Sequence, residues 1–162
     1  MKSLRGILRV QQVRELSLFA ILILVLLLFS TQIENYFSPR TFDRIATTVA
    51  IITIVAVGQT VVVLTRNIDL SVGSIVGFTA FFVGQQFAFY RELNPFAAVA
   101  LAMGLGALMG TLNGFLVAYG RVPAVVVTLG TLAIFRGGLV EYSGSQSIAT
   151  RMLPDWIKEL PQ

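Results

Sequence analysis

The apolar segment at residues 45–65 constrains the fold more than any other feature of the sequence. It runs for 21 residues without a charged side chain. As an α-helix it would be about 31 Å long, which matches a hydrocarbon core about 30 Å thick. Many of its residues are β-branched, which in water would favour a strand. In lipid, however, only helices and closed barrels satisfy the backbone, so its length predicts a membrane-spanning helix.

The composition of the whole chain supports lipid as its surroundings. Hydrophobic residues make up 56% of the 162 residues and charged residues only 12%, whereas soluble domains carry about 25% charged residues. The net charge of +4 could suggest nucleic acid, but the basic residues are scattered singly and form no basic face. We therefore expect a lipid bilayer as partner and no nucleic acid.

Four other apolar segments accompany the first, and together they predict an all-α integral membrane protein with four to five transmembrane helices. The predicted helices cover about residues 16–33, 45–65, 72–90, 95–119 and 124–140. Residues 1–15 are expected to form a cytoplasmic N-terminal segment, 34–44 a polar loop, and 142–162 a periplasmic loop. Within that last loop, residues 154–158 predict a short interfacial helix anchored by Trp156.

Two of these segments leave alternatives open. The first follows a basic start and could be a signal peptide, but no small-x-small cleavage site follows it, which favours an uncleaved helix. The fifth has only 12 apolar residues before Arg136. It either continues to Val140 and spans the bilayer, or it is re-entrant.

The distribution of Lys and Arg predicts the orientation. With the N-terminus inside, six basic residues are cytoplasmic and three are external, which favours this orientation. The six are Lys2, Arg5, Arg9, Arg14, Arg66 and Arg121, and the three are Arg40, Arg44 and Arg91.

The residue types that are missing exclude several chemistries. The sequence contains no Cys and no His, so disulfides, thiol nucleophiles, histidine metal ligands and Ser-His-Asp triads are excluded. Its only lysines are Lys2 and Lys158, and neither follows a glycine-rich phosphate loop. We therefore predict no catalytic residues, no metal site and no cofactor in this chain, with any ATP and magnesium on a partner.

The polar turn at residues 65–71 separates two apolar segments. A charged residue at the centre of a membrane helix costs about 2.5–3.5 kcal/mol, so Arg66 and Asp69 must lie at an interface or face a protein-lined cavity. As a simple hairpin turn, Arg66 would suit the C-terminal end of one helix, and Asp69 or Ser71 would cap the next. The alternative is a gate or a substrate contact, and the charges alone do not decide between them.

Small residues recur every four positions along the fourth segment and predict close helix packing. This small-residue stripe consists of Ala102, Gly106, Gly110, Gly114 and Ala118.

Uncharged polar residues occur inside the predicted spans. Amides offer both donors and acceptors and suit a neutral, hydroxyl-rich ligand, although they also join helices. The candidates for a substrate pathway are Gln59, Gln85 and Asn113. Arg136 and Glu141 are the only ionisable residues that could lie at depth in the bilayer.

Residues 58–74 and 113–131, the latter continuing to Arg136 and Gly137, go beyond generic hydropathy. They resemble the ribose, xylose, rhamnose and quorum-signal-sugar permeases of bacterial ABC importers, in order and in spacing. The resemblance extends from about residue 16 to the end of the chain. It implies the permease component of an importer for a monosaccharide or related sugar in the bacterial cytoplasmic (inner) membrane, not an enzyme.

The same resemblance implies partners and a gate. The partners would be a second permease subunit, a cytoplasmic ABC ATPase pair and a periplasmic sugar-binding protein. In related importers the turn after the second helix lies near the cytoplasmic gate, which favours the gate interpretation here. Carried onto this sequence, the gate residues are Arg66, Asn67, Ile68 and Asp69.

The chain departs from that family in length, because family permeases are about twice as long. We therefore expect the N-terminal half of a larger polytopic permease, truncated at residue 162. One alternative is a self-contained small oligomeric membrane protein without an ATPase. Another is a secondary transporter or channel, for which the sequence offers few buried ionisable residues.

Overall fold

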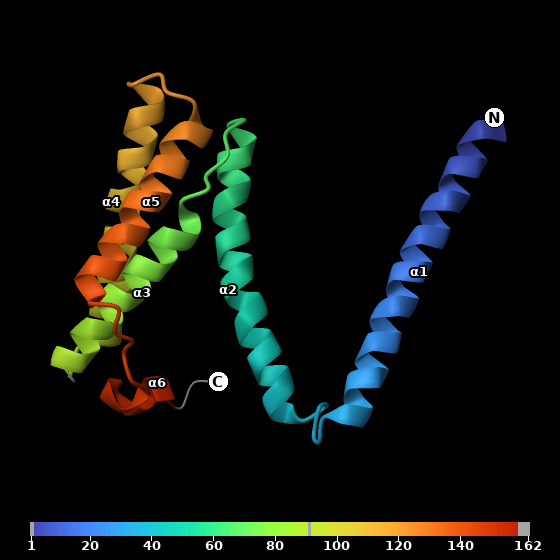
Figure 1. Cartoon of the computed structure of the whole chain (residues 1–162), viewed down its shortest axis with the longest axis horizontal. Coiled ribbons are helices and arrows are strands. Elements are labelled where there is room, and N and C mark those ends of the chain that lie inside the picture. Colours follow the sequence, from blue (N-terminus) through green and yellow to red (C-terminus); the bar gives the residue numbers. More distant parts are fainter. Residues whose placement is uncertain (1, 91, 159–162) are drawn as a thin grey trace. The chain divides into compact units, whose positions relative to one another are not determined.

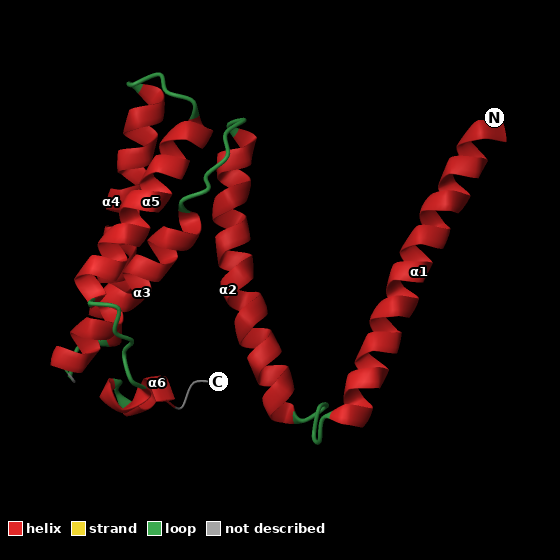
Figure 2. Ribbon diagram, in the orientation of Figure 1, coloured by secondary structure: helices red, strands yellow, loops and turns green. Residues whose placement is uncertain are grey.

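A computed structural model describes residues 2–90 and 92–158, with side chains from residue 12 onward. Arg91, which was assigned to the external side, and residues 159–162 of the expected periplasmic loop lie outside the described residues. Within the described part of the chain every regular element is helical, which confirms the predicted all-α fold (Figures 1 and 2). The elements are α1 (Lys2–Gln32), α2 (Pro39–Leu64), α3 (Val72–Phe89), α4 (Pro95–Ala118), α5 (Ala124–Ser143), a 3₁₀ turn (Thr150–Met152) and α6 (Asp155–Lys158).

Five of these helices are long and apolar enough to cross a membrane, counting Gln12–Gln32 as the apolar part of α1. The fifth of them, α5, is a continuous helix of 20 residues that passes through Arg136 without a break. At 1.5 Å per residue it is about 30 Å long, so it is long enough to span.

Two helices begin earlier than the sequence predicted. α1 begins at Lys2 instead of residue 16, since residues 2–15 contain no proline to stop it. α2 begins at Pro39, so the loop predicted for 34–44 was wrong over residues 39–44. Proline suits the first position of a helix, and the Ser38 hydroxyl accepts the Thr41 N–H at 3.3 Å.

The chain divides into two compact units, one up to Ala46 and one from Thr47 onward. In the first unit, the ring of Tyr36 stacks on Phe29 with centroids 6.3 Å apart and meets Phe37 edge-on at 5.2 Å. These contacts fold the connection that follows α1 against the end of that helix.

In the second unit, α3, α4 and α5 pack on one another, with α3 against both of the others (Figure 1). α2 has no buried residue. Among the described residues of the unit, five buried side chains are polar and four are apolar. They are Phe87, Ala98, Met109 and Val127, together with Ser71, Ser74, Asn113, Thr128 and Thr131. Large apolar side chains point outward, as expected where lipid replaces water.

The last turn of α5 and the segment after it both pack on α3. Tyr142 lies 6.0–6.1 Å from three phenylalanine rings of α3, Phe78, Phe81 and Phe82. Farther on, the short helix expected at 154–158 is present as α6, and its Trp156 meets Phe87 edge-on at 5.6 Å. These aromatic contacts hold the tail against the helix bundle.

Candidate functional site

At the start of the turn at residues 65–71, two backbone hydrogen bonds terminate helix α2. The Arg66 N–H donates to the Val63 carbonyl at 2.8 Å, and the Asn67 N–H reaches back to Val62 at 3.3 Å. This pair of bonds is the Schellman motif, which normally places glycine at the left-handed position. Here Arg66 occupies it with φ of +60°, and a left-handed non-glycine residue costs about 1–2 kcal/mol.

The second half of the turn is organised by Asp69. One of its carboxylate oxygens, Oδ1, accepts the backbone N–H of Ser71 at 2.8 Å and the Ser71 hydroxyl at 2.6 Å. Ser71 stands at the N-cap of α3 but makes no side-chain cap bond. Of the two caps expected for this helix, Ser71 was therefore wrong, and Asp69 engages the Ser71 N–H that precedes the first helical residue.

Ser71 links the turn to α4. Its side chain is completely buried, and its Oγ accepts a hydrogen bond from Nδ2 of Asn113 at 2.7 Å. Because the Asp69 carboxylate can only accept, the single Ser71 hydroxyl proton is committed to it. Ser71 can then only accept from Asn113, which requires the nitrogen of that amide to face the turn and its oxygen to face away.

The oxygen of Asn113 has no partner. The residue is 5% exposed, and its Oδ1 is buried without a hydrogen bond among the described residues. Leaving a buried acceptor unpaired costs about 1–3 kcal/mol. An orphaned acceptor beside an otherwise satisfied network indicates a place where a donor from outside this chain would fit.

Two more side chains attach the turn to neighbouring helices. Gln59 of α2 donates to the Asp69 carbonyl at 3.1 Å, and buried Thr128 of α5 approaches the Ile68 carbonyl at 3.4 Å. Asn67 bonds locally, since its amide donates to the carbonyl and the hydroxyl of Thr65, each at 3.0 Å. The turn is therefore tied to α2, α4 and α5 by side chains, which a simple surface hairpin would not require.

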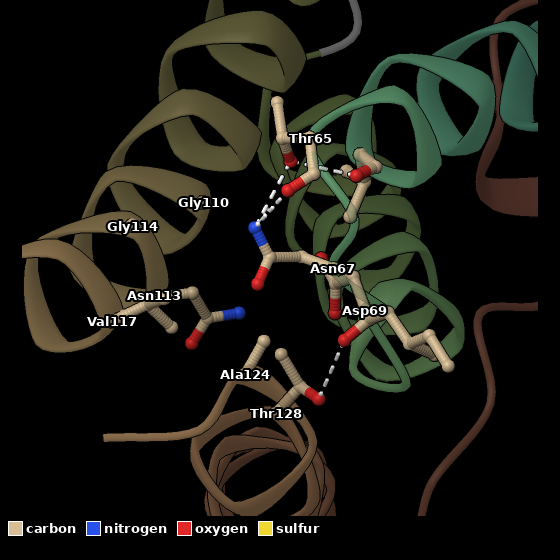
Figure 3. Close-up of a pocket in the computed structure, with 11 residues that line it drawn as sticks. Thr65, Asn67, Asp69, Gly110, Asn113, Gly114, Val117, Ala124 and Thr128 are labelled. Carbon is tan, nitrogen blue, oxygen red and sulfur yellow. Dashed lines mark hydrogen bonds between the residues drawn. The ribbon is translucent and has the colours of Figure 1, made fainter. Parts of the chain in front are cut away.

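These residues surround a cavity of about 190 Å³ between the turn, α4 and α5 (Figure 3). Its polar lining comes from Thr65, Asn67, Asp69, Asn113 and Thr128, and its apolar and backbone lining from Val62, Ile68, Gly110, Gly114, Val117 and Ala124. Figure 3 shows the side chains of Asn67 and Asp69 from the turn, Asn113 from α4 and Thr128 from α5 gathered around one space.

The structure thus brings together part of the set predicted from the sequence. Asn67, Ile68 and Asp69 line the cavity with Asn113, and Gln59 bonds to the turn beside them. Arg66 is exposed and outside the lining. Gln85 does not join the others, because it is 14 residues beyond Ser71 on α3, about 21 Å along the axis.

The small-residue stripe of α4 lines part of the cavity, and no other described helix covers its glycines. Gly110 and Gly114 line the cavity. A Cβ atom added at Gly106, Gly110 or Gly114 would meet no atom of another part of the chain within 4 Å, so no other described helix packs closely on these positions. The close packing predicted for the stripe stays a prediction, and within this chain the face is open.

Sequence reasoning missed Thr65 and Thr128 and treated Ser71 only as a cap. Arg136 lies at the other end of α5 from the turn, where it lines an open pocket of about 450 Å³ with Gln146 and serines that follow α5. Among residues 2–90 and 92–158 no group of three His, Cys, Asp or Glu side chains is placed to hold a metal ion.

Comparison with known proteins identifies relatives of this chain. Residues 41–153, which include α2 to α5, match the family model described as the permease component of the branched-chain amino acid transport system. The autoinducer 2 import system permease protein LsrC of Yersinia pseudotuberculosis serotype O:3 (strain YPIII) is 41% identical over 128 residues, which is 79% of this chain and 33% of that protein. LsrC of Yersinia pestis (strain Pestoides F) matches equally well. The chain therefore spans about a third of the length of these relatives, and no solved structure matches it.

Proposed function

This chain belongs to the family of transport permeases typified by the branched-chain amino acid transport system, and from that premise we propose that it forms part of the membrane pathway of an ATP-driven importer for a monosaccharide or related sugar. It is a membrane protein with five apolar helices. The observation that carries the proposal is that the matched residues are the ones that build the cavity below the turn. The similar proteins are named as import permeases for autoinducer 2, and the amide-rich lining suits a hydroxyl-rich ligand.

The proposal includes partners for ATP hydrolysis, for substrate delivery and for the rest of the membrane pathway. A permease component works as one part of a transport system. We infer that a cytoplasmic ABC ATPase pair binds ATP and magnesium, that a periplasmic sugar-binding protein delivers substrate, and that a second permease subunit completes the pathway.

We place the chain in the bacterial cytoplasmic membrane with its N-terminus inside. Two exposed arginines support this orientation, Arg66 after α2 and Arg121 after α4. The ends of α2 and α4 both contribute to the cavity, so the two arginines mark the same side of the membrane. Lys and Arg gather on the cytoplasmic side of membrane proteins.

The turn then forms part of the cytoplasmic gate. Arg66, Asn67, Ile68 and Asp69 are its gate residues, and Gln59 and Asn113 hold it against α2 and α4. A sugar that leaves for the cytoplasm would pass this point, and Gln85 would meet it earlier, nearer the opposite end of α3.

A chimeric permease tests the function without relying on the length of this chain. Residues 41–153 replace the matching segment of the LsrC permease of Yersinia pseudotuberculosis in cells that contain its ATPase and binding protein. We expect ATP-dependent uptake of autoinducer 2 or of a labelled monosaccharide. A chimera with Asn113→Asp is the matched negative control, because the new carboxylate would face the Ser71 oxygen and neither group could donate a hydrogen bond to the other. A chimera that inserts at normal levels yet transports none of these sugars would contradict the proposed function.

A further inference from the structure

Each donor-bearing side chain in the lining of the cavity already donates at least one hydrogen bond within the chain, whereas several side-chain acceptors are left free among the described residues. The Asn67 amide donates twice to Thr65, whose hydroxyl in turn donates to the last turn of α2. The Asn113 amide donates to Ser71, and the Thr128 hydroxyl faces a backbone carbonyl of the turn. Each of the four lining residues with a side-chain donor therefore already makes a hydrogen bond.

Three side-chain oxygens around the cavity have no such partner among the described residues. They are Oδ1 of Asn113, which is orphaned and buried, Oδ1 of Asn67, and Oδ2 of Asp69. All three residues line the same cavity, and Asn113 and Asn67 face it from opposite sides in Figure 3. The orientation of the Asn113 amide follows from the proton of Ser71, so the acceptor character of this wall is fixed by the Asp69 carboxylate.

We propose that this cavity is a selectivity site that accepts a neutral, polyhydroxylated ligand and rejects anionic groups. The inference rests on the proposed import of a sugar and specifies what the gate selects. Hydroxyl groups donate to the three free oxygens, while Val62, Val117 and Ala124 offer an apolar surface for the ring. A volume of 190 Å³ corresponds to about six water molecules at roughly 30 Å³ each, which is enough for part or all of a small sugar ring.

Charged ligands fit the same wall poorly. A carboxylate or phosphate needs donors, and the lining offers it the Asp69 carboxylate instead. A metal cation needs about six oxygen ligands, whereas one oxygen of the only carboxylate in the lining is occupied by Ser71. The described residues also contain no cluster of metal-ligating side chains.

The absence of cysteine from the sequence makes the site directly testable. Gly114→Cys places a thiol in the cavity lining, and Gly104→Cys places one on the same helix outside the lining. A Cβ atom at either position meets no atom of another part of the chain within 4 Å. In membranes, each thiol reacts with a small neutral methanethiosulfonate reagent, and the rate is measured with and without a probe. The neutral probes are D-ribose, D-xylose and L-rhamnose, and the anionic probe is D-ribose 5-phosphate.

We expect at least one neutral sugar to slow labelling at Gly114→Cys, by about threefold at twice its dissociation constant, with no effect at Gly104→Cys. The anionic probe should give no protection. Asn113→Leu in the Gly114→Cys background should abolish protection. Asn67→Ala, at a half-buried position of the turn, should weaken protection by the sugar at Gly114→Cys. The same substitution should leave the labelling rate at Gly104→Cys unchanged.

Two results would overturn the selectivity site. One is protection by D-ribose 5-phosphate equal to that by the sugars, and the other is no protection by any neutral sugar. Uptake by the chimeric permease is measured separately. Uptake without protection rejects the selectivity site and leaves the importer standing, whereas protection without uptake supports the site and counts against the importer.

Discussion

The amide of Asn113 donates to the hydroxyl of Ser71 at 2.7 Å and joins two residues that are 42 positions apart in the chain. This bond ties the last third of α4 to the start of α3. The direction of this bond depends on Asp69. Because the Asp69 carboxylate accepts a hydrogen bond from the Ser71 hydroxyl, the Ser71 oxygen can only accept from Asn113. One carboxylate in the turn thereby determines which atom of a buried amide faces the cavity.

Substitutions of Asn113 test whether Ser71 requires a hydrogen-bond donor at this position. Asn113→Asp would place a carboxylate where Ser71 needs a donor, and Asn113→Leu would remove the bond without creating repulsion. Hydrogen bonds between membrane helices contribute about 0.6–1.7 kcal/mol, so we expect Asn113→Leu to lower the free energy of unfolding by roughly that amount. Asn113→Asp should lower it further.

The measurement is unfolding by SDS in mixed micelles, followed by circular dichroism. Thr111→Val, an exposed substitution on the same helix, controls for general effects of changing α4. Equal stability of Asn113→Asp and the unchanged chain would show that Ser71 does not require a donor.

Arg66 offers a test of backbone strain. Its left-handed φ of +60° suits glycine, so Arg66→Gly should stabilise the turn relative to Arg66→Ala by about 1 kcal/mol. Both variants remove the charge and the long side chain, and they differ only at Cβ. The same SDS titration compares them, and an alanine variant as stable as the glycine variant would rule out the strained Schellman closure.

Gly120 and Gly104 predict opposite responses to alanine. A Cβ at Gly120 would overlap the backbone carbonyl of Leu116, whereas a Cβ at Gly104 meets no atom within 4 Å. Gly120→Ala should therefore shift the end of α4 and lower stability. Gly104→Ala should raise stability by about 0.5–1 kcal/mol, as alanine does inside a helix. If both variants changed stability in the same direction, the backbone contact at Gly120 would be wrong.

The placement of the connections can be tested by labelling single cysteines from each side of the membrane. Leu70→Cys and Val122→Cys are in the connections after α2 and α4, and Glu92→Cys is in the connection after α3. Each site is exposed, and the arginines that set the orientation are kept. We expect positions 70 and 122 to react from the cytoplasmic side and position 92 from the other. Labelling of 70 and 122 from opposite sides would contradict a cavity that is lined by the turn together with the end of α4 and the start of α5.

The sequence predicted the number and character of the helices because long uncharged runs have few alternatives in lipid. It misplaced the starts of α1 and α2. The basic residues before the apolar part of α1 continue the helix because no proline interrupts them, and the polar residues at the start of α2 are helical because Ser38 caps that helix. Local chemistry also identified Asp69 as important in the turn. It could not identify Thr128, which meets the turn across 60 residues of sequence, or assign Ser71 its role between Asp69 and Asn113. Such roles depend on how helices pack, which single-residue patterns do not encode.

The small-residue stripe of α4 leads to a prediction that separates folding from assembly. Gly106 is half-buried, but a Cβ atom there meets no atom of another part of the chain within 4 Å. Gly106→Leu should insert in membranes and unfold at the same SDS concentration as Gly104→Leu, because both variants replace a helical glycine whose Cβ position is open. If the stripe receives a helix of the completed importer, leucine would push that helix away, since close approach there depends on small residues. The chimeric permease with Gly106→Leu should then lose co-purification with its ATPase, whereas Gly104→Leu, equally open but two positions off the stripe, should keep it. Equal assembly of the two leucine variants would mean that this face of α4 meets lipid instead of protein.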